Sequence, residues 1–182
     1  MKKFLLLAMP AMVLLSCNDK AMNTTASTDD SSNTTAATTN EAKEERNKQA
    51  ALASVQAFNS GGGVDSVLKD ADKDIVEYGE GSMAPANSLD STKAGLAMWL
   101  KAVPDYKGTD FIAVADGDYV MVYGTWTGTW KGDLMGMKPT GKTFKVSDVD
   151  IFKFNDAGKI IEHRAVQSNR EAARQLGMQM PG

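Results

Sequence analysis

Hydrophobic residues follow two different periods along this chain, and the first period is helical. Residues 41–59 predict an α-helix in which Ala51, Val55 and Phe58 fall on one face. Three consecutive glycines at 61–63 follow this segment and end the predicted helix.

Two further apolar segments also have helical spacing. In the first, Val64, Val67, Leu68 and Ala71 repeat at intervals of three and four residues, which predicts a short helix. The second begins with a cap at Asp90 or Ser91 and ends before Pro104. Its apolar stripe comprises Leu96, Trp99, Leu100 and Val103. Between the two, residues 75–78 could form a short strand, and residues 80–87 read as a loop.

From residue 111 onward the period changes to two, which is typical of strands. Strands are predicted at 111–115, 119–130, 143–154 and 159–167, with tight turns at 116–118 and 155–158 and a short last helix at 170–176. The long second strand carries Val120, Val122, Trp126 and Trp130 on one face. Helices followed by antiparallel strands predict an α+β fold, a curved sheet with helices packed across it.

The N-terminus has the pattern of an export signal. Two lysines precede an apolar run at residues 4–15, which is shorter than the about 20 residues needed to span a bilayer. Leu14-Leu15-Ser16-Cys17 resembles a lipobox, so we expect residues 1–16 to be a lipoprotein signal peptide and Cys17 to be lipidated. The alternative is an ordinary secretory signal with a chance cysteine.

Residues 17–40 are dominated by Thr, Ser, Asn and Ala, and they predict a disordered tether between the lipid and one domain at 41–182. Cys17 is the single cysteine, so no disulfide is expected in the domain. Asn18 follows Cys17 where an Asp would indicate inner-membrane retention. By resemblance to known sorting rules, we expect a lipid-anchored protein of the cell envelope, in the outer membrane of a Gram-negative bacterium.

Charge and motif spacing argue against nucleic acids and nucleotides as partners. The chain has 20 basic and 23 acidic residues, a net charge of −3, and no basic stripe. Residues 136–143 match the P-loop pattern G-x-x-x-x-G-K-[ST]. A P-loop, however, needs a helix after it, and residues 144–154 alternate as a strand.

Several segments together resemble the SnoaL-like polyketide and ester cyclases. The segment from Gly128 to Lys142 resembles the central signature of that family, and Ala115-Asp116-Gly117-Asp118 resembles its hairpin. The resemblance implies the cone-shaped fold of nuclear transport factor two and ketosteroid isomerase. In that fold three helices pack on a curved antiparallel sheet, which often dimerises, around an apolar pocket. Trp130 stands where the family has a histidine, and Arg164 and Ala165 replace a usual Trp-Asp.

Chemistry without a cofactor in such a pocket needs a base beside a carbonyl group and donors that hold the resulting enolate. Strand alternation places Asp148, Asp150 and Phe152 on one face. Asp150 matches the family position and is the candidate base, with Asp148 beside it. Alternatively, both acids are structural and pair with lysine or arginine.

His163 is the single histidine, so a multi-histidine metal site is not expected. We expect no other metal and no cofactor. It could donate a proton in the pocket, or it could be a satisfied or exposed side chain. Arg164, on the opposite face, could bind a ligand carboxylate or pair with Glu162. The remaining pocket candidates are aromatic: Tyr78, Trp99, Tyr106, Trp126 and Trp130. Core packing is the alternative for Trp99, and a dimer surface is the alternative for Trp126 and Trp130.

Three functions follow, in order of preference. The first is binding of a small hydrophobic ligand at the membrane surface. The second is a cofactor-free cyclase, isomerase or lyase acting on a carbonyl compound. The third is an interaction domain for another envelope protein.

Overall fold

The computed structural model describes residues 30–81, 84–166 and 169–178. The predicted signal peptide, Cys17 and residues 18–29 of the predicted tether lie outside these ranges. Within the described ranges, no helix combines the length and the apolar character needed to cross a membrane.

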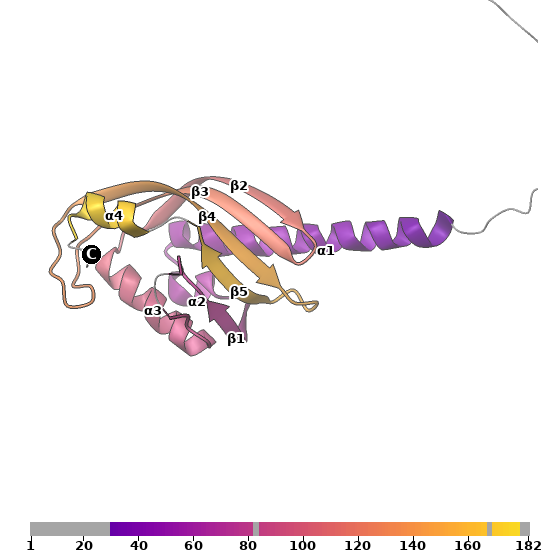
Figure 1. Cartoon of the computed structure of the whole chain (residues 1–182), viewed down its shortest axis with the longest axis horizontal. Coiled ribbons are helices and arrows are strands. Elements are labelled where there is room, and N and C mark those ends of the chain that lie inside the picture. The colour runs from indigo at the N-terminus through magenta and orange to yellow at the C-terminus, as the bar shows by residue number, and fades with distance from the viewer. Residues whose placement is uncertain (1–29, 82–83, 167–168, 179–182) are drawn as a thin grey trace, which may run out of the picture.

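The first helix is longer than the sequence pattern predicts. Helix α1 (Asp30–Ala57) runs along the sheet and projects past its end (Figure 1). The start was predicted at residue 41, so residues 30–40 are helical rather than disordered tether. Once the packed part of a helix exists, each added residue costs little compared with nucleation. The side chain of Asn40 also donates a 2.7 Å hydrogen bond to Glu44, one turn later.

The later helices follow the predicted order with shifted ends. The 3-10 helix η1 (Phe58–Ser60) and helix α2 (Gly63–Val67) come first. The sequence pattern predicted that the second helix includes Ala71, but α2 ends four residues earlier. Helix α3 (Leu89–Ala102) starts before the predicted caps, because Ser88 Oγ accepts a 3.2 Å hydrogen bond from the Ser91 amide. Helix α4 (Asn169–Leu176) lies near the C-terminal end.

Five strands form one sheet in the order β1-β5-β4-β3-β2. They are β1 (Ala71–Glu77), β2 (Lys107–Asp116), β3 (Tyr119–Thr129), β4 (Thr143–Phe154) and β5 (Ile160–Ala165). The predicted α+β class is confirmed. One pair differs from the expected antiparallel sheet, because β1 lies parallel to β5. Most of the domain connects these two strands, so no hairpin forces them to run in opposite directions.

The alternation predicted for the sheet matches its burial. The four residues predicted to share a face of strand 119–130 are all buried inside the domain: Val120, Val122, Trp126 and Trp130. The dimer-surface alternative for Trp126 and Trp130 is therefore wrong. The opposite face of β2 and β3 exposes a different set, namely Ile112, Val114, Tyr119, Met121 and Tyr123.

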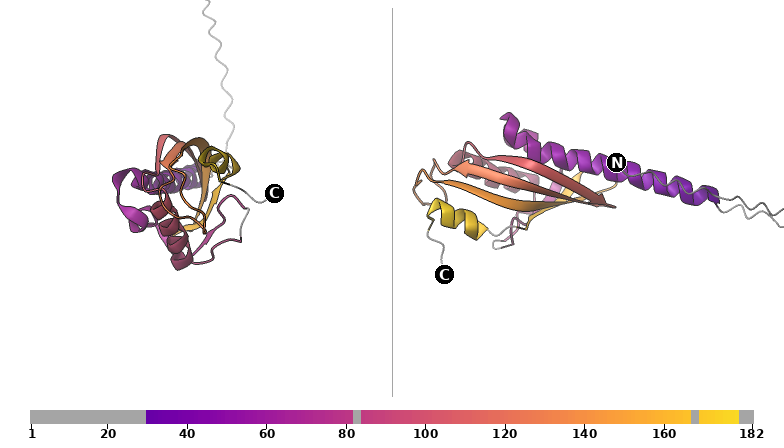
Figure 2. Two further views of the ribbon diagram at one scale, coloured as in Figure 1. Left: turned by 90° about the vertical axis from the view of Figure 1, so that its left-hand side faces the viewer. Right: turned by 90° about the horizontal axis from the view of Figure 1, so that it is seen from above.

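Helices pack on the buried face of the sheet and surround its concave side (Figure 2). Helix α1 packs against β2 and β3, α3 against β1, and α4 against β4. The core between these layers combines Trp130, Phe144, Phe152 and Phe154 from the sheet region with smaller residues of α1 and α3. This arrangement leaves the end of the concave face near β1 free to line a cavity.

The loop after β3 docks on the end of α3. Lys131 and Gly132 both donate backbone hydrogen bonds to the Ala102 carbonyl, and the Trp130 indole donates to the Gly132 carbonyl at 2.6 Å. Thr143 is the last residue of the segment that matches the P-loop pattern, and it begins β4. The structure therefore has a strand where a P-loop needs a helix.

This docking predicts that Gly132→Ala destabilises the domain. A Cβ atom at residue 132 would lie 2.5 Å from the Lys101 carbonyl oxygen and 3.1 Å from the Ala102 Cα. Both contacts are with backbone, so we expect a loss of roughly 1–3 kcal/mol in the free energy of unfolding, measured by urea denaturation.

Gly95→Ala is the matched control. Gly95 lies within α3, and a Cβ there meets no atom within 4 Å. We expect it to raise the free energy of unfolding by up to about 1 kcal/mol, because alanine favours a helix over glycine. Equal effects of the two substitutions would contradict the close docking of residue 132.

Candidate functional site

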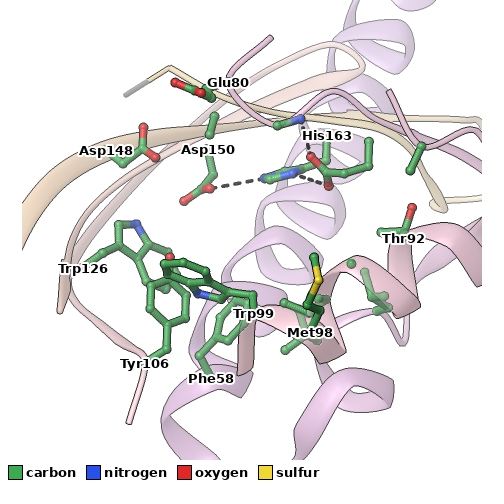
Figure 3. Close-up of a pocket in the computed structure, with 18 of the residues that line it drawn as sticks. Phe58, Glu80, Thr92, Met98, Trp99, Tyr106, Trp126, Asp148, Asp150 and His163 are labelled. Atoms are coloured by element: carbon green, nitrogen blue, oxygen red, sulfur yellow. Dashed lines mark hydrogen bonds and ion pairs between the residues drawn. The ribbon is translucent and has the colours of Figure 1, made fainter. Parts of the chain in front are cut away.

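The candidate site is a cavity of about 530 Å³ between the concave face of the sheet and helices α1, α2, α3 and α4. Its wall is mainly apolar, with polar side chains gathered on one side. In Figure 3, Asp148, Asp150, Glu80 and His163 lie on one side, and the rings of Phe58, Trp99 and Tyr106 lie across from them. A volume of this size is within the range of small-molecule sites.

A hydrogen-bonded row of three ionisable side chains crosses the polar side. His163 Nδ1 lies 2.7 Å from Glu77 Oε2, and His163 Nε2 lies 3.2 Å from Asp150 Oδ1. The row joins β1, β5 and β4, three neighbouring strands. Glu77 Oε1 also accepts a 2.7 Å hydrogen bond from the Gly79 amide, which fixes the outer end of the row.

The row keeps the imidazole protonated. Burial lowers the pKa of His163, but the charge of Glu77 and the hydrogen bonds to Asp150 and Glu77 outweigh it and raise this pKa to about 10. For Glu77 burial acts in the opposite direction and raises the pKa. The charge of His163 and the hydrogen bonds from His163 and Gly79 outweigh burial, so the pKa of Glu77 lies below its ordinary value. At neutral pH both ring nitrogens of His163 therefore donate.

The apolar side is a packed group of aromatic rings. Tyr106 stacks on Trp126 with ring centroids 4.9 Å apart, and Phe58 and Trp99 meet Tyr106 edge-on at 5.1 and 5.6 Å. Burial, with the nearby charges of Asp150 and Asp148, holds the pKa of the Tyr106 hydroxyl well above its usual value. Tyr106 is therefore a neutral part of the wall.

The structure brings most of the predicted site residues together. Seven of them line the cavity: Trp99, Tyr106, Trp126, Asp148, Asp150, Phe152 and His163. His163 combines two of the readings offered for it, because it is satisfied by two carboxylates and also faces the cavity. Trp99 lines the cavity while packing against the core, so its two readings also coincide.

Three predicted pocket residues lie elsewhere. Trp130 is fully within the core near the end of α3. Arg164 points to the other face of β5, where it pairs with Glu162 at 3.1 Å, as the alternative reading held. Its guanidinium also stacks 3.8 Å from the ring centroid of Tyr78, so neither of these residues lines the cavity.

Sequence reasoning missed several residues of the wall, above all Glu77. A signal for it existed, because Ile75 is apolar and Glu77 shares its face by alternation. Ile75 is buried and both residues line the cavity. Phe58, Glu80, Thr92 and Met98 come from segments whose position over the sheet only the tertiary fold sets.

Metal binding has no support in the described part of the chain, where no group of three or more His, Cys, Asp or Glu side chains could hold an ion. The site instead offers an imidazolium, carboxylates and aromatic surface. These groups suit binding and proton transfer to or from an uncharged organic molecule.

The row predicts an unusual titration of His163. Because it is the only histidine, its ring signals in an NMR spectrum of a tag-free protein are unambiguous. We expect the imidazole to stay protonated from neutral pH to a midpoint near pH 10. Glu77→Gln removes the largest favourable charge, and it should move the midpoint down toward the ordinary value near 6.5.

Glu162→Gln is the control for this titration. Glu162 is the sequence neighbour of His163, but it pairs with Lys153 and Arg164. The midpoint should not change in this variant. A wild-type midpoint near 6.5 would show that the row does not hold a charged imidazole.

Comparison with known proteins gives this fold and site a family. AclR from Streptomyces galilaeus, a proposed hydroxylase, is 30% identical over 76% of this chain and 89% of its own, with a TM-score of 0.62. A proposed polyketide cyclase from Xanthomonas campestris pv. campestris is 18% identical over 74% of this chain and 98% of its own, with a TM-score of 0.66. A proposed SnoaL-like polyketide cyclase from Jannaschia sp. CCS1 is 21% identical over 75% and 95%, with a TM-score of 0.65.

No functionally curated protein matches this sequence significantly. The family profile of SnoaL-like polyketide cyclases matches residues 48–176, which include all five strands and the whole row of Glu77, His163 and Asp150. The chain belongs to the SnoaL-like polyketide cyclase family.

Proposed function

We propose that this chain is a lipid-anchored protein of the cell envelope whose SnoaL-like domain binds a small hydrophobic molecule. The cavity of about 530 Å³ is the observation that carries the proposal. Binding of an apolar ligand against this wall would be favoured by about 25 cal/mol for each Å² of apolar surface removed from water. A ligand with one polar edge would match both sides of the wall.

Several solved relatives support a small organic ligand, because they are described as proposed polyketide cyclases or as a proposed hydroxylase. Those descriptions concern the relatives. For this chain they favour a small organic molecule over a protein segment as the occupant of the cavity.

A second function, cofactor-free acid–base catalysis, is favoured by the position of Asp150. One of its oxygens is held by His163. The other, Oδ2, is buried and makes no hydrogen bond within the described residues. A carboxylate fixed on one oxygen and open on the other is suited to take a proton from a carbon next to a carbonyl group.

In such a reaction Asp150 Oδ2 would accept the proton, and the electron pair of the C–H bond would form the enolate. Return of the proton to another carbon would complete an isomerisation. Attack of the enolate carbon on a second carbonyl would form the ring bond, and the alkoxide left on that carbonyl oxygen would take the proton back from Asp150 to complete a cyclisation. His163 would keep its own proton and orient Asp150. It is thus a positioning residue in this scheme.

The experiment for both functions is native mass spectrometry of residues 18–182 purified from the natural host. The Xanthomonas relative consists almost entirely of this domain, which indicates that the domain folds alone. We expect an extra mass of a small molecule that is lost on denaturation. Its identity gives the compound with which to measure turnover.

Asp150→Asn separates binding from catalysis. If Asp150 is the base, the variant should still bind the ligand, though more weakly, and lose turnover by roughly 10²–10⁴-fold. Asp156→Asn changes an exposed carboxylate outside the cavity wall, and this control should retain turnover. An empty wild-type domain, even after incubation with a cell extract, would contradict both functions.

The lipid anchor has its own test. Cys17→Ser in the full-length chain should prevent lipidation, because the hydroxyl cannot replace the thiol in that modification. We expect the protein to move from the membrane fraction to the soluble fraction on centrifugation, and its incorporation of labelled palmitate to disappear. Continued membrane association with unchanged labelling would contradict the assignment of Cys17.

A further inference from the structure

Two buried polar atoms on the cavity wall have no hydrogen-bond partner among the described residues. They are the indole nitrogen Nε1 of Trp126 and the carboxylate oxygen Oδ2 of Asp150. The exposed fractions of the two residues are only 3% and 8%. In Figure 3 the Trp126 nitrogen faces the side of the cavity that carries Asp148 and Asp150.

Leaving such atoms unpaired is unfavourable, because each has given up its hydrogen bonds to water without a replacement. Where the fold needs no ligand, the chain pairs its indoles, since Trp130 donates to the Gly132 carbonyl at 2.6 Å. Trp126 lies on the same strand face and has no such acceptor. The contrast between the two tryptophans points to a partner for Trp126 that comes from outside the chain.

The position of the Trp126 ring is fixed by its neighbours. It stacks on Tyr106 with an interplanar angle of 7°, and Phe58 and Phe111 meet it edge-on at 5.4 and 5.7 Å. Any Cβ atom at Gly108 would lie 2.9 Å from the Trp126 ring, so the glycine makes room for it. The indole N–H is therefore held in place before a ligand arrives.

The two atoms set opposite requirements. An indole N–H can only donate, and a carboxylate oxygen can only accept. The cluster around His163 has two carboxylates and one imidazolium, which leaves one net negative charge. Among the described residues that line the cavity, none is a lysine or arginine that could pair with a ligand anion.

We propose that Trp126 Nε1 and Asp150 Oδ2 together determine ligand specificity, and that they select an uncharged molecule with a carbonyl oxygen and a hydroxyl or other donor on one edge. Trp126 is the residue that recognises the carbonyl. In a proton-abstraction reaction the same N–H would face the oxygen on which the enolate charge develops. The inference rests on ligand binding in the cavity and deepens it.

A series of naphthalenes of nearly equal shape tests this selection. Ethylnaphthalene has no polar group, acetonaphthone adds the carbonyl, hydroxyacetonaphthone adds a donor as well, and naphthoate carries a negative charge. Dissociation constants for residues 18–182 would be measured by quenching of tryptophan fluorescence, and by calorimetry for variants. We expect affinity to rise from ethylnaphthalene to the hydroxyketone, and naphthoate to bind at least tenfold more weakly than acetonaphthone.

Trp126→Phe keeps an aromatic ring and removes the N–H. It should weaken acetonaphthone binding by roughly tenfold and leave ethylnaphthalene nearly unchanged. Asp150→Asn should remove the advantage of the hydroxyketone over the ketone. Similar losses for all four compounds in Trp126→Phe would overturn the inference, as would tighter binding of naphthoate than of acetonaphthone.

A wild-type measurement covers the case in which Trp126→Phe does not fold. The chain has three tryptophans, so a nitrogen-labelled sample gives three indole N–H signals. Acetonaphthone should shift one of these signals downfield, and ethylnaphthalene should not. Equal shifts with both compounds would overturn the role of Trp126 while leaving cavity binding intact. Failure of every naphthalene to bind would instead contradict the proposed function itself.

Discussion

A charged imidazole ring, held between two carboxylates, connects three neighbouring strands of the sheet. Glu77, His163 and Asp150 come from β1, β5 and β4, and the ring has hydrogen bonds on both sides. Removing either carboxylate would leave a largely buried positive charge with half of its compensation. The position of β1 and the shape of the polar wall are therefore set by the same contacts, so the fold and the candidate site cannot vary independently.

The concave face of the sheet serves both as core and as cavity wall, and both uses occur along one strand. Along β4, Phe144 and Phe154 belong to the core, Asp148 and Asp150 between them line the cavity, and Phe152 does both. One strand thus carries both functions without a break in its alternation. Helix α4 packs against β4 and also contributes Ala172, Ala173 and Leu176 to the cavity wall.

Local pattern was sufficient to predict the parts of the site that lie on hairpin-connected strands. Alternation along β4 predicts a shared face for Asp148 and Asp150, and alternation along β5 predicts that His163 faces away from Glu162 and Arg164. For Glu77, alternation with Ile75 indicates the inner face but not the partner of the carboxylate. Its contact with His163 depends on parallel pairing between strands separated by most of the domain, and no local signal encodes that register. The prediction that Trp130 lines the pocket is wrong for a related reason. The pattern assigns it the same face as Trp126, but Trp130 lies past the strand end and its indole bonds to the docked loop.

The edge position of β1 gives the site a link to local unfolding. β1 pairs with only one other strand, and its register with β5 is irregular between Ala71 and Val76. Two backbone hydrogen bonds between Glu77 and Ala86 reinforce the C-terminal end of β1, which carries the carboxylate bound to His163. If that edge frays, Glu77 leaves the imidazole, and His163 loses the charge that most favours its protonation. Opening of the edge strand and release of the His163 proton are then coupled, and the hydrogen bonds between Glu77 and the loop at residue 86 oppose both.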